Sequence, residues 1–377
     1  MSAKDTKLSP IIKWAGGKES ELQIIHENAP DIFNNYYEPF VGGGSVFMSF
    51  NTNKAFINDK SSELINLYHC ISNKNESFFD WTEKICSSWN HLLNFARQHS
   101  EICEIYRDYR EDKLSDSQLK NTAKDFLAKN NAALQDVLSS DFVWHRDIYQ
   151  KELEKNISRK LVRMKKVEKE RHIMPNSDIF DNVETAFMSS MYMYFRCLYN
   201  DSELMSSDIG FTTSIFFFIR NYAYSGMFRY NAEGKFNVPY GGIGYNHKLL
   251  DKKIEYYKSE LLINHFSNAS IQNQDFQDFF EKNKPTENDF VFLDPPYDTE
   301  FSTYAKNEFS KADQTRLANY LLNDCKAKWM MVIKNTPFIY SLYANHNLHI
   351  SSFDKNYRVS FMNRNDKNVE HLLIRNY

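Results

Sequence analysis

The chain has 377 residues, which is enough for about two to three domains and for a sizeable buried core. Hydrophobic residues make up 42% and charged residues 25% of the sequence, and this composition excludes a disordered chain, a collagen-like repeat and a disulfide scaffold. The formal net charge is −3, so a nucleic-acid partner would have to be bound by a local basic patch and not by the charge of the whole chain.

We expect a cytoplasmic protein with no membrane partner and no bound metal. The N-terminal segment 1–7 lacks the apolar run of a secretory signal, and apolar runs such as 215–219 are far too short to cross a bilayer. The five cysteines are scattered and form no C-x-x-C pair, which indicates reduced thiols and not a zinc site.

In chain order, the first predicted elements are two short strands at 36–41 and 54–58, and the first of them runs into three consecutive glycines. A long segment without helix breakers follows. No glycine occurs in residues 45–209, and Pro175 is the only proline there. Because glycine and proline are the residues that interrupt helices, we predict that residues 61–205 are mostly helical.

Four further apolar runs toward the C-terminus are predicted to be strands. They are typical of central parallel strands, because such strands are buried on both faces, and the helical patterns between several of them fit β-α-β units. We predict an α/β domain built from residues 1–69 and 260–377, with a second domain, residues 70–259, inserted between its two parts. The four runs are 270–272, 290–293, 329–333 and 371–374.

The glycines after the first predicted strand indicate a ligand site. Gly42, Gly43 and Gly44 would let the backbone turn sharply and approach a ligand closely. Asp59 ends the next strand, at a position where an acidic side chain can accept hydrogen bonds from ribose hydroxyls. Together these residues favour a nucleoside-type cofactor, although a plain tight turn and a surface aspartate would also explain them.

A second motif, Asp294-Pro295-Pro296-Tyr297, directly follows the apolar strand 290–293. The carboxyl end of such a strand is where open α/β sheets bind ligands. The two prolines have no backbone N–H, so the Asp294 carboxylate and the following carbonyl remain as acceptors beside an aromatic ring. Two acceptors and a ring suit a planar amine, and we favour this interpretation over a merely rigid strand end.

Three further segments suit anionic partners without proving one. Residues 13–18, Lys-Trp-Ala-Gly-Gly-Lys, form a small-residue turn between lysines, but they lack the spacing of a P-loop. Residues 220–242 mix Arg, Asn, Tyr and Gly in a hairpin-like pattern that suits base contacts, or equally an aromatic ribbon packed on the core. Residues 151–171 carry nine basic and four acidic side chains, which suits phosphate contacts or a solvated helix face.

In their order and spacing, these motifs resemble the Dam-like family of adenine-specific DNA methyltransferases, the class alpha amino-methyltransferases. The resemblance covers residues 10–70 and 205–377 and leaves out the long insert 70–205. It implies a Rossmann-like methyltransferase sheet with an inserted, largely helical target-recognition domain. It also implies methyl transfer from S-adenosyl-methionine to the exocyclic amine of an adenine flipped out of duplex DNA. The matching segments are 13–18, 38–47, 58–59, 229–239, 275–276 and 294–297.

The resemblance assigns site residues by position. The catalytic motif would be Asp294, Pro295, Pro296 and Tyr297. The methyl donor would be bound by Trp14, Ala15, Gly16, Lys18, Glu38, Phe40, Gly42, Gly44, Ser45, Asp59, Asp275, Phe276 and Asp294. DNA would be contacted by Lys13, Tyr224, Ser225, Met227, Arg229, Asn231 and Pro239.

Individual roles follow from the same resemblance. Trp14 and Lys18 would contact the methionine end of the methyl donor, with Phe40 lining the same pocket. Asp59 would hold its ribose, and Asp275 with Phe276 would lie at its adenine. Asp294 would face both the methyl donor and the target. As a hypothesis of mechanism, we expect Asp294 and the Pro295 carbonyl to accept hydrogen bonds from the target amine, on whose base Tyr297 would stack. Tyr224 is the expected intercalating residue and Arg229 the expected reader of guanine.

Two departures from the family pattern leave the recognition sequence open. Ser225 stands where the best-known members have asparagine, and Gly242-Ile243 lacks their basic-aromatic pair. Met227, Arg229 and Pro239 would suit a GATC-like site. The expected partners are double-stranded DNA and, in a restriction-modification system, a restriction endonuclease.

Three other functions would explain some or all of these motifs. An RNA adenine methyltransferase would use the same catalytic motif on another planar amine. A DNA-binding subunit with a relic cofactor fold would keep the fold without the chemistry, but the intact Asp294–Tyr297 motif argues against it. A nicotinamide dehydrogenase would explain the glycines but not that motif.

Overall fold

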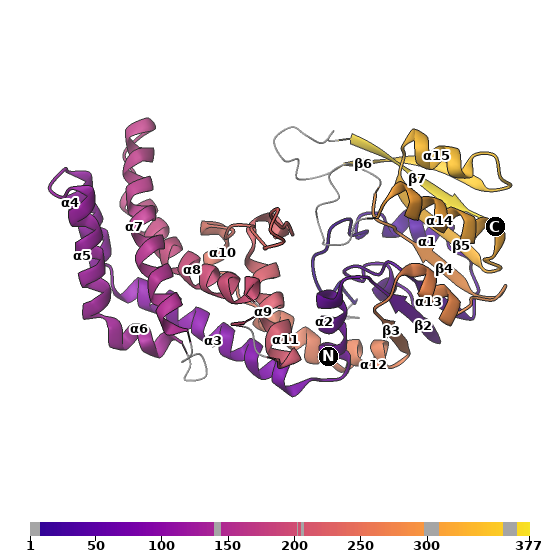
Figure 1. Ribbon diagram of the computed structural model, residues 1–377, viewed down its shortest axis with the longest axis horizontal. Coiled ribbons are helices and arrows are strands. Elements are labelled where there is room, and N and C mark those ends of the chain that lie inside the picture. The colour runs from indigo at the N-terminus through magenta and orange to yellow at the C-terminus, as the bar shows by residue number, and fades with distance from the viewer. Residues whose placement is uncertain (1–7, 139–144, 202, 205–206, 298–308, 357–367) are drawn as a thin grey trace, which may run out of the picture. The chain divides into compact units, whose positions relative to one another are not determined.

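The computed structural model describes residues 8–138, 145–201, 203–204, 207–297, 309–356 and 368–377. The chain divides into two compact units (Figure 1). The first consists of Met1–Asn73 and Tyr256–Tyr377, and the second of Lys74–Glu255. The first unit therefore combines both ends of the chain, and the second is a continuous segment between them.

The first unit is built on one seven-stranded sheet (Figure 1). Its strands are β1 (Asn35–Glu38), β2 (Lys54–Asn58), β3 (Ala269–Gln272), β4 (Phe290–Leu293), β5 (Lys328–Lys334), β6 (His349–Asn356) and β7 (Asn368–Arg375). They lie in the order β3-β2-β1-β4-β5-β7-β6. The first five in this order pair in parallel, and β7 is antiparallel to both of its neighbours.

The predicted α/β class is confirmed, as are all six strand predictions. Two details differ. The run 371–374 is central but antiparallel, because β7 pairs along its whole length with β6. Strand β6 was not predicted, and it lies at the edge of the sheet, where its sequence is largely polar and several side chains are exposed. An edge strand needs no continuous apolar run, so the apolar pattern could not reveal it.

The order of the strands reverses between β1 and β4. From β1 the chain moves outward to β2 and β3, and it then returns to β4 on the other side of β1. In open α/β sheets, ligands bind beyond the carboxyl ends of strands at such a reversal. The segments that leave β1 and β4 there are the two motifs 39–45 and 294–297.

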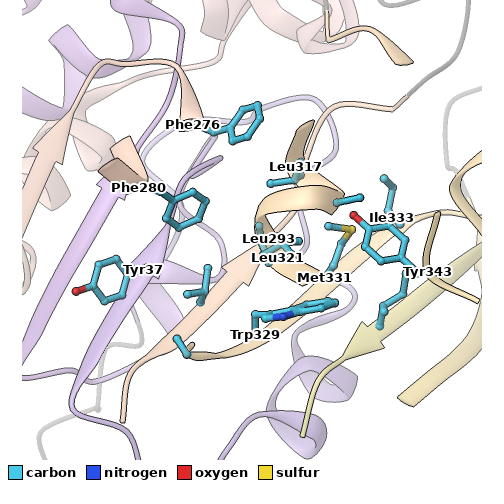
Figure 2. Packing of buried hydrophobic residues seen from close by; sticks show 14 of the residues in the cluster. Tyr37, Phe276, Phe280, Leu293, Leu317, Leu321, Trp329, Met331, Ile333 and Tyr343 are labelled. Carbon is cyan, nitrogen blue, oxygen red and sulfur yellow. The ribbon is translucent and has the colours of Figure 1, made fainter. Parts of the chain in front are cut away.

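A buried apolar cluster holds this part of the sheet in place (Figure 2). Leu293 of β4 and Met331 of β5 are fully buried in it. Helix α13 (Phe276–Lys282) contributes Phe280, and helix α14 (Lys311–Asn323) contributes Leu317. Because β4 and α14 share this core, the residues that follow β4 and those on α14 are fixed relative to one another.

The remaining helices of the first unit are α1 (Leu22–Asn28), α2 (Ser62–Ser72), α12 (Glu260–Ser267) and α15 (Pro337–Tyr343). Helix α11 (Asp251–Lys258) crosses the boundary between the units. A short 3₁₀ turn, Phe47–Ser49, follows the glycine-rich segment.

The described part of the second unit is almost entirely helical. Its helices are α3 (Glu76–Gln98), α4 (Glu101–Arg110), α5 (Asp116–Lys129), α6 (Asn131–Val137), α7 (Arg146–Glu170), α8 (Asn176–Asn200), α9 (Ile209–Tyr222) and α10 (Ile243–Asn246), with a 3₁₀ turn at Tyr224–Gly226. The prediction of a mostly helical segment 61–205 is confirmed for its described residues. Residues 139–144, 202 and 205 of that segment lie outside the description.

No described helix combines the length and hydrophobicity that a bilayer crossing requires. No group of three or more His, Cys, Asp or Glu side chains within the described ranges is arranged to hold a metal ion. All five cysteines are free thiols.

Candidate functional site

An ion pair joins the two motifs that are farthest apart in the sequence. Lys18 Nζ lies 2.5 Å from Asp294 Oδ1. The same ammonium donates to the Gly16 carbonyl at 2.8 Å and to the Tyr297 hydroxyl at 3.5 Å. Lys18 is only 1% exposed. A buried ammonium requires such partners, so it ties the N-terminal turn to the end of β4.

Three glycines let the backbones around this ion pair approach closely. Gly16 has a φ of +77°, and a Cβ atom there would lie 3.9 Å from Asp294 Oδ2. A Cβ atom on Gly43 would lie 2.3 Å from the Ile12 carbonyl oxygen, and one on Gly44 would lie 2.6 Å from the Tyr68 hydroxyl. A larger residue at Gly43 would therefore displace the backbone at Ile12, one at Gly44 would displace Tyr68, and one at Gly16 would be strained by the positive φ.

A buried carboxyl group lies next to the ion pair. Glu38, the last residue of β1, is 2% exposed, and Tyr36 donates its hydroxyl hydrogen to Oε2 at 2.7 Å. Burial raises the pKa of Glu38 well above its usual value, and the nearby Asp294 charge acts in the same direction. Lys18 opposes this with a smaller effect. One cation and two carboxyl groups thus share a poorly solvated region.

Asp59 lies at the carboxyl end of β2 and holds the glycine turn. Its Oδ2 accepts a hydrogen bond from the Gly42 N–H at 3.1 Å, and its Oδ1 accepts one from the Ser61 N–H at 2.9 Å. Desolvation raises the pKa of Asp59 to about 6, although these backbone hydrogen bonds act to lower it. Each carboxylate oxygen has a second lone pair that can accept a further hydrogen bond.

Three aromatic rings gather beside the carboxyl end of β1. The Phe40 ring centroid lies 5.8 Å from that of Phe276 and 5.5 Å from that of Phe309, and the last two are 5.7 Å apart. Phe40 and Phe276 were both predicted to line the binding site of the methyl donor, and the structure places them together. Phe309 was not predicted, because it belongs to no motif.

Asp275 caps the N-terminus of α13, where its side chain accepts from the Gln277 N–H. Arg316 of α14 pairs with both Asp275 oxygens at 3.3 Å. The guanidinium carbon also lies 4.7 Å from the Phe276 ring centroid. Arg316 carries no sequence signal that would mark it, since its contact with Asp275 arises only from the packing of α14 beside α13.

Two further contacts hold the segment that leaves β4. The Gln314 side chain, fully buried on α14, donates to the Pro296 carbonyl at 2.7 Å. The Tyr297 hydroxyl lies 3.1 Å from Nε2 of His371, a buried histidine on β7. Neither partner was predicted as a site residue.

The other predicted residues of this region lie around the same turns. Trp14 packs against Gly42, where an added Cβ atom would lie 3.0 Å from Trp14 Cδ1. Ser45 is buried, and Lys13 and Ala15 are exposed.

The second unit carries the other predicted DNA contacts on an irregular ribbon, residues 223–240, which follows α9. Bridges between Ala223 and Tyr240 and between Tyr230 and Phe236 hold its two arms. The ribbon is anchored on α8, where the Tyr192 hydroxyl donates to the Val238 carbonyl at 2.9 Å.

The sequence suggested either a surface for base contacts or an aromatic ribbon packed on the core, and each interpretation describes one face of this ribbon. Phe228, Phe236 and Val238 are buried, whereas Arg229 and Pro239 are exposed. The ribbon therefore packs an apolar face on the core and presents a polar face outward.

The predicted DNA contacts on the ribbon differ in exposure, backbone conformation and hydrogen bonding. Tyr224 is 45% exposed, and Met227 is partly exposed. Ser225 adopts a left-handed backbone conformation with a φ of +52°. The Asn231 side chain accepts from the N–H groups of Glu233 and Lys235, so it shapes the turn at the tip of the ribbon.

Comparison with known proteins gives consistent relatives. The chain is 26% identical over 379 residues to the type II methyltransferase M.CviBI of Paramecium bursaria Chlorella virus NC1A, covering 98% of this chain and 100% of that protein. It is 26% identical to the type II methyltransferase M1.LlaDCHI of Lactococcus lactis subsp. cremoris, with 91% and 87% covered. It is 21% identical to the DNA adenine methylase of Haemophilus influenzae, with 89% and 83% covered.

A family model described as D12 class N6 adenine-specific DNA methyltransferase matches residues 14–357, which include both motifs of the candidate site. The family description names DNA and not RNA as the substrate. The match spans nearly the whole chain, and the relatives are matched over most of their own lengths. The chain therefore belongs to the D12 class of N6 adenine-specific DNA methyltransferases.

Proposed function

We propose that this adenine-specific DNA methyltransferase takes its methyl group from S-adenosyl-methionine and transfers it to an adenine flipped out of duplex DNA. The observation that carries the proposal is the contact between Lys18 and Asp294 at the reversal point of the sheet. When bound, S-adenosyl-methionine supplies a methyl group that the positive charge of its sulfonium activates for transfer.

The residues at the reversal point fit this methyl donor. Lys18 and Glu38 are a buried cation and a buried acid, which complement the carboxylate and ammonium of a methionine end. Asp59 presents carboxylate oxygens to ribose hydroxyls. Phe276 offers a ring to an adenine base, and Phe40, whose ring centroid lies 5.8 Å from that of Phe276, lines the neighbouring part of the pocket. We assign the remaining lining of the site to Trp14, Ala15, Gly16, Gly42, Gly44, Ser45, Asp275 and Asp294.

Asp294 and the Pro295 carbonyl would activate the target amine. The lone pair of an adenine amine is delocalised into the ring, so the nitrogen is a poor nucleophile. Two acceptors that bind its two hydrogens draw the nitrogen toward tetrahedral geometry and localise the lone pair. The ion pair with Lys18 favours the ionised form of Asp294, which is the form that accepts. It also holds the carboxylate in place before the base arrives.

Tyr297 would stack on the flipped base. It is partly exposed, and it directly follows the two prolines that fix the backbone after Asp294. Stacking of a base on an aromatic ring offsets part of the cost of about a few kcal/mol of removing it from the duplex.

We infer that the second unit is the target-recognition domain and the first the catalytic domain. Its exposed ribbon residues would read the DNA, with Tyr224 inserting between bases and Arg229 contacting guanine. Ser225, Met227, Asn231 and Pro239 would shape that surface, and Lys13 would add a DNA contact from the first unit.

The context we infer is a restriction-modification system in the cytoplasm. Two of the relatives are named type II methyltransferases. Methylation by this chain would then protect its own recognition sites from a partner endonuclease.

The test is methyl transfer by Asp294→Ala, with Asp324→Ala as the control, since Asp324 is an exposed acid that follows α14. We expect Asp294→Ala to abolish methylation while DNA binding persists, and Asp324→Ala to behave as the original protein. Normal turnover by Asp294→Ala would refute the assignment of the catalytic motif.

A further inference from the structure

The Tyr297 hydroxyl contacts two polar groups from elements distant in sequence. Lys18 Nζ lies 3.5 Å from it, and His371 Nε2 lies 3.1 Å from it. The Tyr297 and His371 ring centroids are 5.6 Å apart and the rings meet edge to face. The far end of the Tyr297 ring is therefore held, and this contact is not explained by the roles assigned so far.

The ammonium of Lys18 fixes one hydrogen-bond direction at the Tyr297 oxygen. An ammonium has only hydrogens to offer, so Lys18 donates and the Tyr297 oxygen accepts. The Tyr297 oxygen and Nε2 of His371 share a second hydrogen bond at 3.1 Å, in which the tautomer of the imidazole sets which of the two donates.

The surroundings of His371 hold its side chain in place. His371 is fully buried on β7, which lies between β5 and β6 in the sheet. Lys334 of β5 and Phe353 of β6 are its direct partners across the strands, and the Phe353 ring centroid is 5.9 Å away. The nearest acidic residues across the β6–β7 pair, Asp354 and Glu370, face each other and not His371.

We propose that His371 is a positioning residue for the target base: its Nε2 shares a hydrogen bond with the Tyr297 hydroxyl and so holds the tyrosine ring ready to stack. This inference rests on the proposed stacking role of Tyr297. A tyrosine ring anchored only at its Cβ atom samples several orientations, whereas one anchored at both ends does not. A residue on an internal strand is well suited to such support, because the sheet fixes its backbone.

The first test compares two substitutions at His371. His371→Phe keeps a ring and removes the hydrogen-bonding nitrogen, and we expect it to lower kcat by about tenfold, the usual size of one lost buried hydrogen bond. His371→Gln supplies a side-chain amide that can accept or donate, and we expect it to recover most of that loss. Affinity for S-adenosyl-methionine should change less than twofold in both variants, which separates positioning from damage to the methyl-donor site.

The matched control is His349→Phe. His349 is an exposed histidine on β6, the strand paired with β7, and it is not part of the site. We expect wild-type kcat and an unchanged melting temperature for this variant. Melting curves of the His371 variants identify any loss of folded protein, and kcat is referred to the folded fraction.

The second test asks whether His371 acts through the tyrosine hydroxyl. Tyr297→Phe removes that hydroxyl and keeps the ring. If His371 acts through it, adding His371→Phe to Tyr297→Phe lowers kcat no further. A tenfold additional loss in the double variant, or wild-type kcat in His371→Phe alone, would overturn the inference.

Failure of the proposed function gives a different result. If Tyr297→Ala leaves kcat unchanged, the stacking role of Tyr297 is wrong and the role of His371 falls with it. If Tyr297→Ala abolishes activity while both His371 variants are normal, only the role of His371 is wrong.

Discussion

Lys18 Nζ lies 2.5 Å from Asp294 Oδ1, and the two side chains are 2% and 18% exposed. The cation and the carboxylate come from the two separate segments of the first unit, so their contact forms only when both segments have folded into one sheet unit. The proposed catalytic carboxylate and a proposed contact for the methyl donor are therefore in direct contact.

The first prediction concerns this pair. Lys18→Met leaves Asp294 and Glu38 as neighbouring acids without their cation, and breaking a buried pair by removing one partner costs about 3 kcal/mol or more. We expect a lower free energy of unfolding in urea and loss of methylation. Lys60→Met, which changes an exposed lysine after β2, is the control and should alter neither. Wild-type stability and activity in Lys18→Met would show that the pair is dispensable.

The second prediction is a pH dependence of methyl-donor binding. The pKa of Asp59 is raised from 3.8 to about 6, so its carboxylate is fully ionised only above that pH. We expect affinity for S-adenosyl-methionine, measured by calorimetry, to rise as pH increases through about 6, because an ionised carboxylate accepts hydrogen bonds from the ribose hydroxyls at both oxygens.

The effect of rising pH on the folding stability that Asp59 contributes has the opposite sign. A pKa raised by burial means that the folded state holds the proton more tightly, so this contribution to stability is present below pH 3.8 and is lost as pH rises through about 6. The gain in binding is therefore not a gain in folding. In Asp59→Asn the binding should be weaker at neutral pH and its change near pH 6 should disappear. An unaltered pH profile in this variant would exclude Asp59 as its source.

The third prediction concerns base reading by the ribbon. Arg229 is exposed, and its Nε donates to Asn237 Oδ1 at 3.1 Å, which holds the guanidinium along the ribbon. If it reads guanine, Arg229→Ala should cost about 1–3 kcal/mol of discrimination at one position of the recognition sequence. Lys235→Ala, at the tip of the same ribbon, is the control. Equal loss on all sequences would mean that Arg229 contacts phosphate only.

The fourth prediction concerns the basic helix α7. Arg159 and Arg163 are exposed and lie one helical turn apart, about 6 Å along the axis. Lys166 is exposed on the next turn and pairs with Glu170 at 3.7 Å. We expect charge reversal at these three positions to weaken DNA binding and to reduce its salt dependence by about 0.9 per lost phosphate contact.

Reversal of Lys120 and Lys124 on α5 is the control, since both are exposed lysines of the same unit. Unchanged DNA affinity and salt dependence after reversal on α7 would show that its basic face is only solvated.

Local patterns in the sequence revealed the elements and the ends of the strands, because burial imposes apolar runs and turns require particular residues. The run 290–293 predicted β4, and the motif after it predicted a site at its end. Contacts between elements left no such pattern. Arg316 and His371 reach the site only because α14 and β7 pack beside it, and no local spacing marks either residue.

Asn231 is a residue that a sequence motif marked, but whose observed contacts differ from the predicted ones. Its position in a family motif predicted a DNA contact, whereas its side chain accepts hydrogen bonds from the backbone of its own turn. A residue that shapes a recognition surface and one that touches the partner can carry the same sequence signal. Only the side-chain geometry separates the two roles, and the DNA contact of Asn231 stays a prediction.

The most direct test of the account is methyl transfer from labelled S-adenosyl-methionine to unmethylated genomic DNA, followed by sequencing that maps modified bases. We predict label in DNA, with N6-methylated adenine confined to one short recognition sequence and absent with Asp294→Ala. Binding of S-adenosyl-methionine without any transfer to DNA, or transfer that persists in Asp294→Ala, would contradict it.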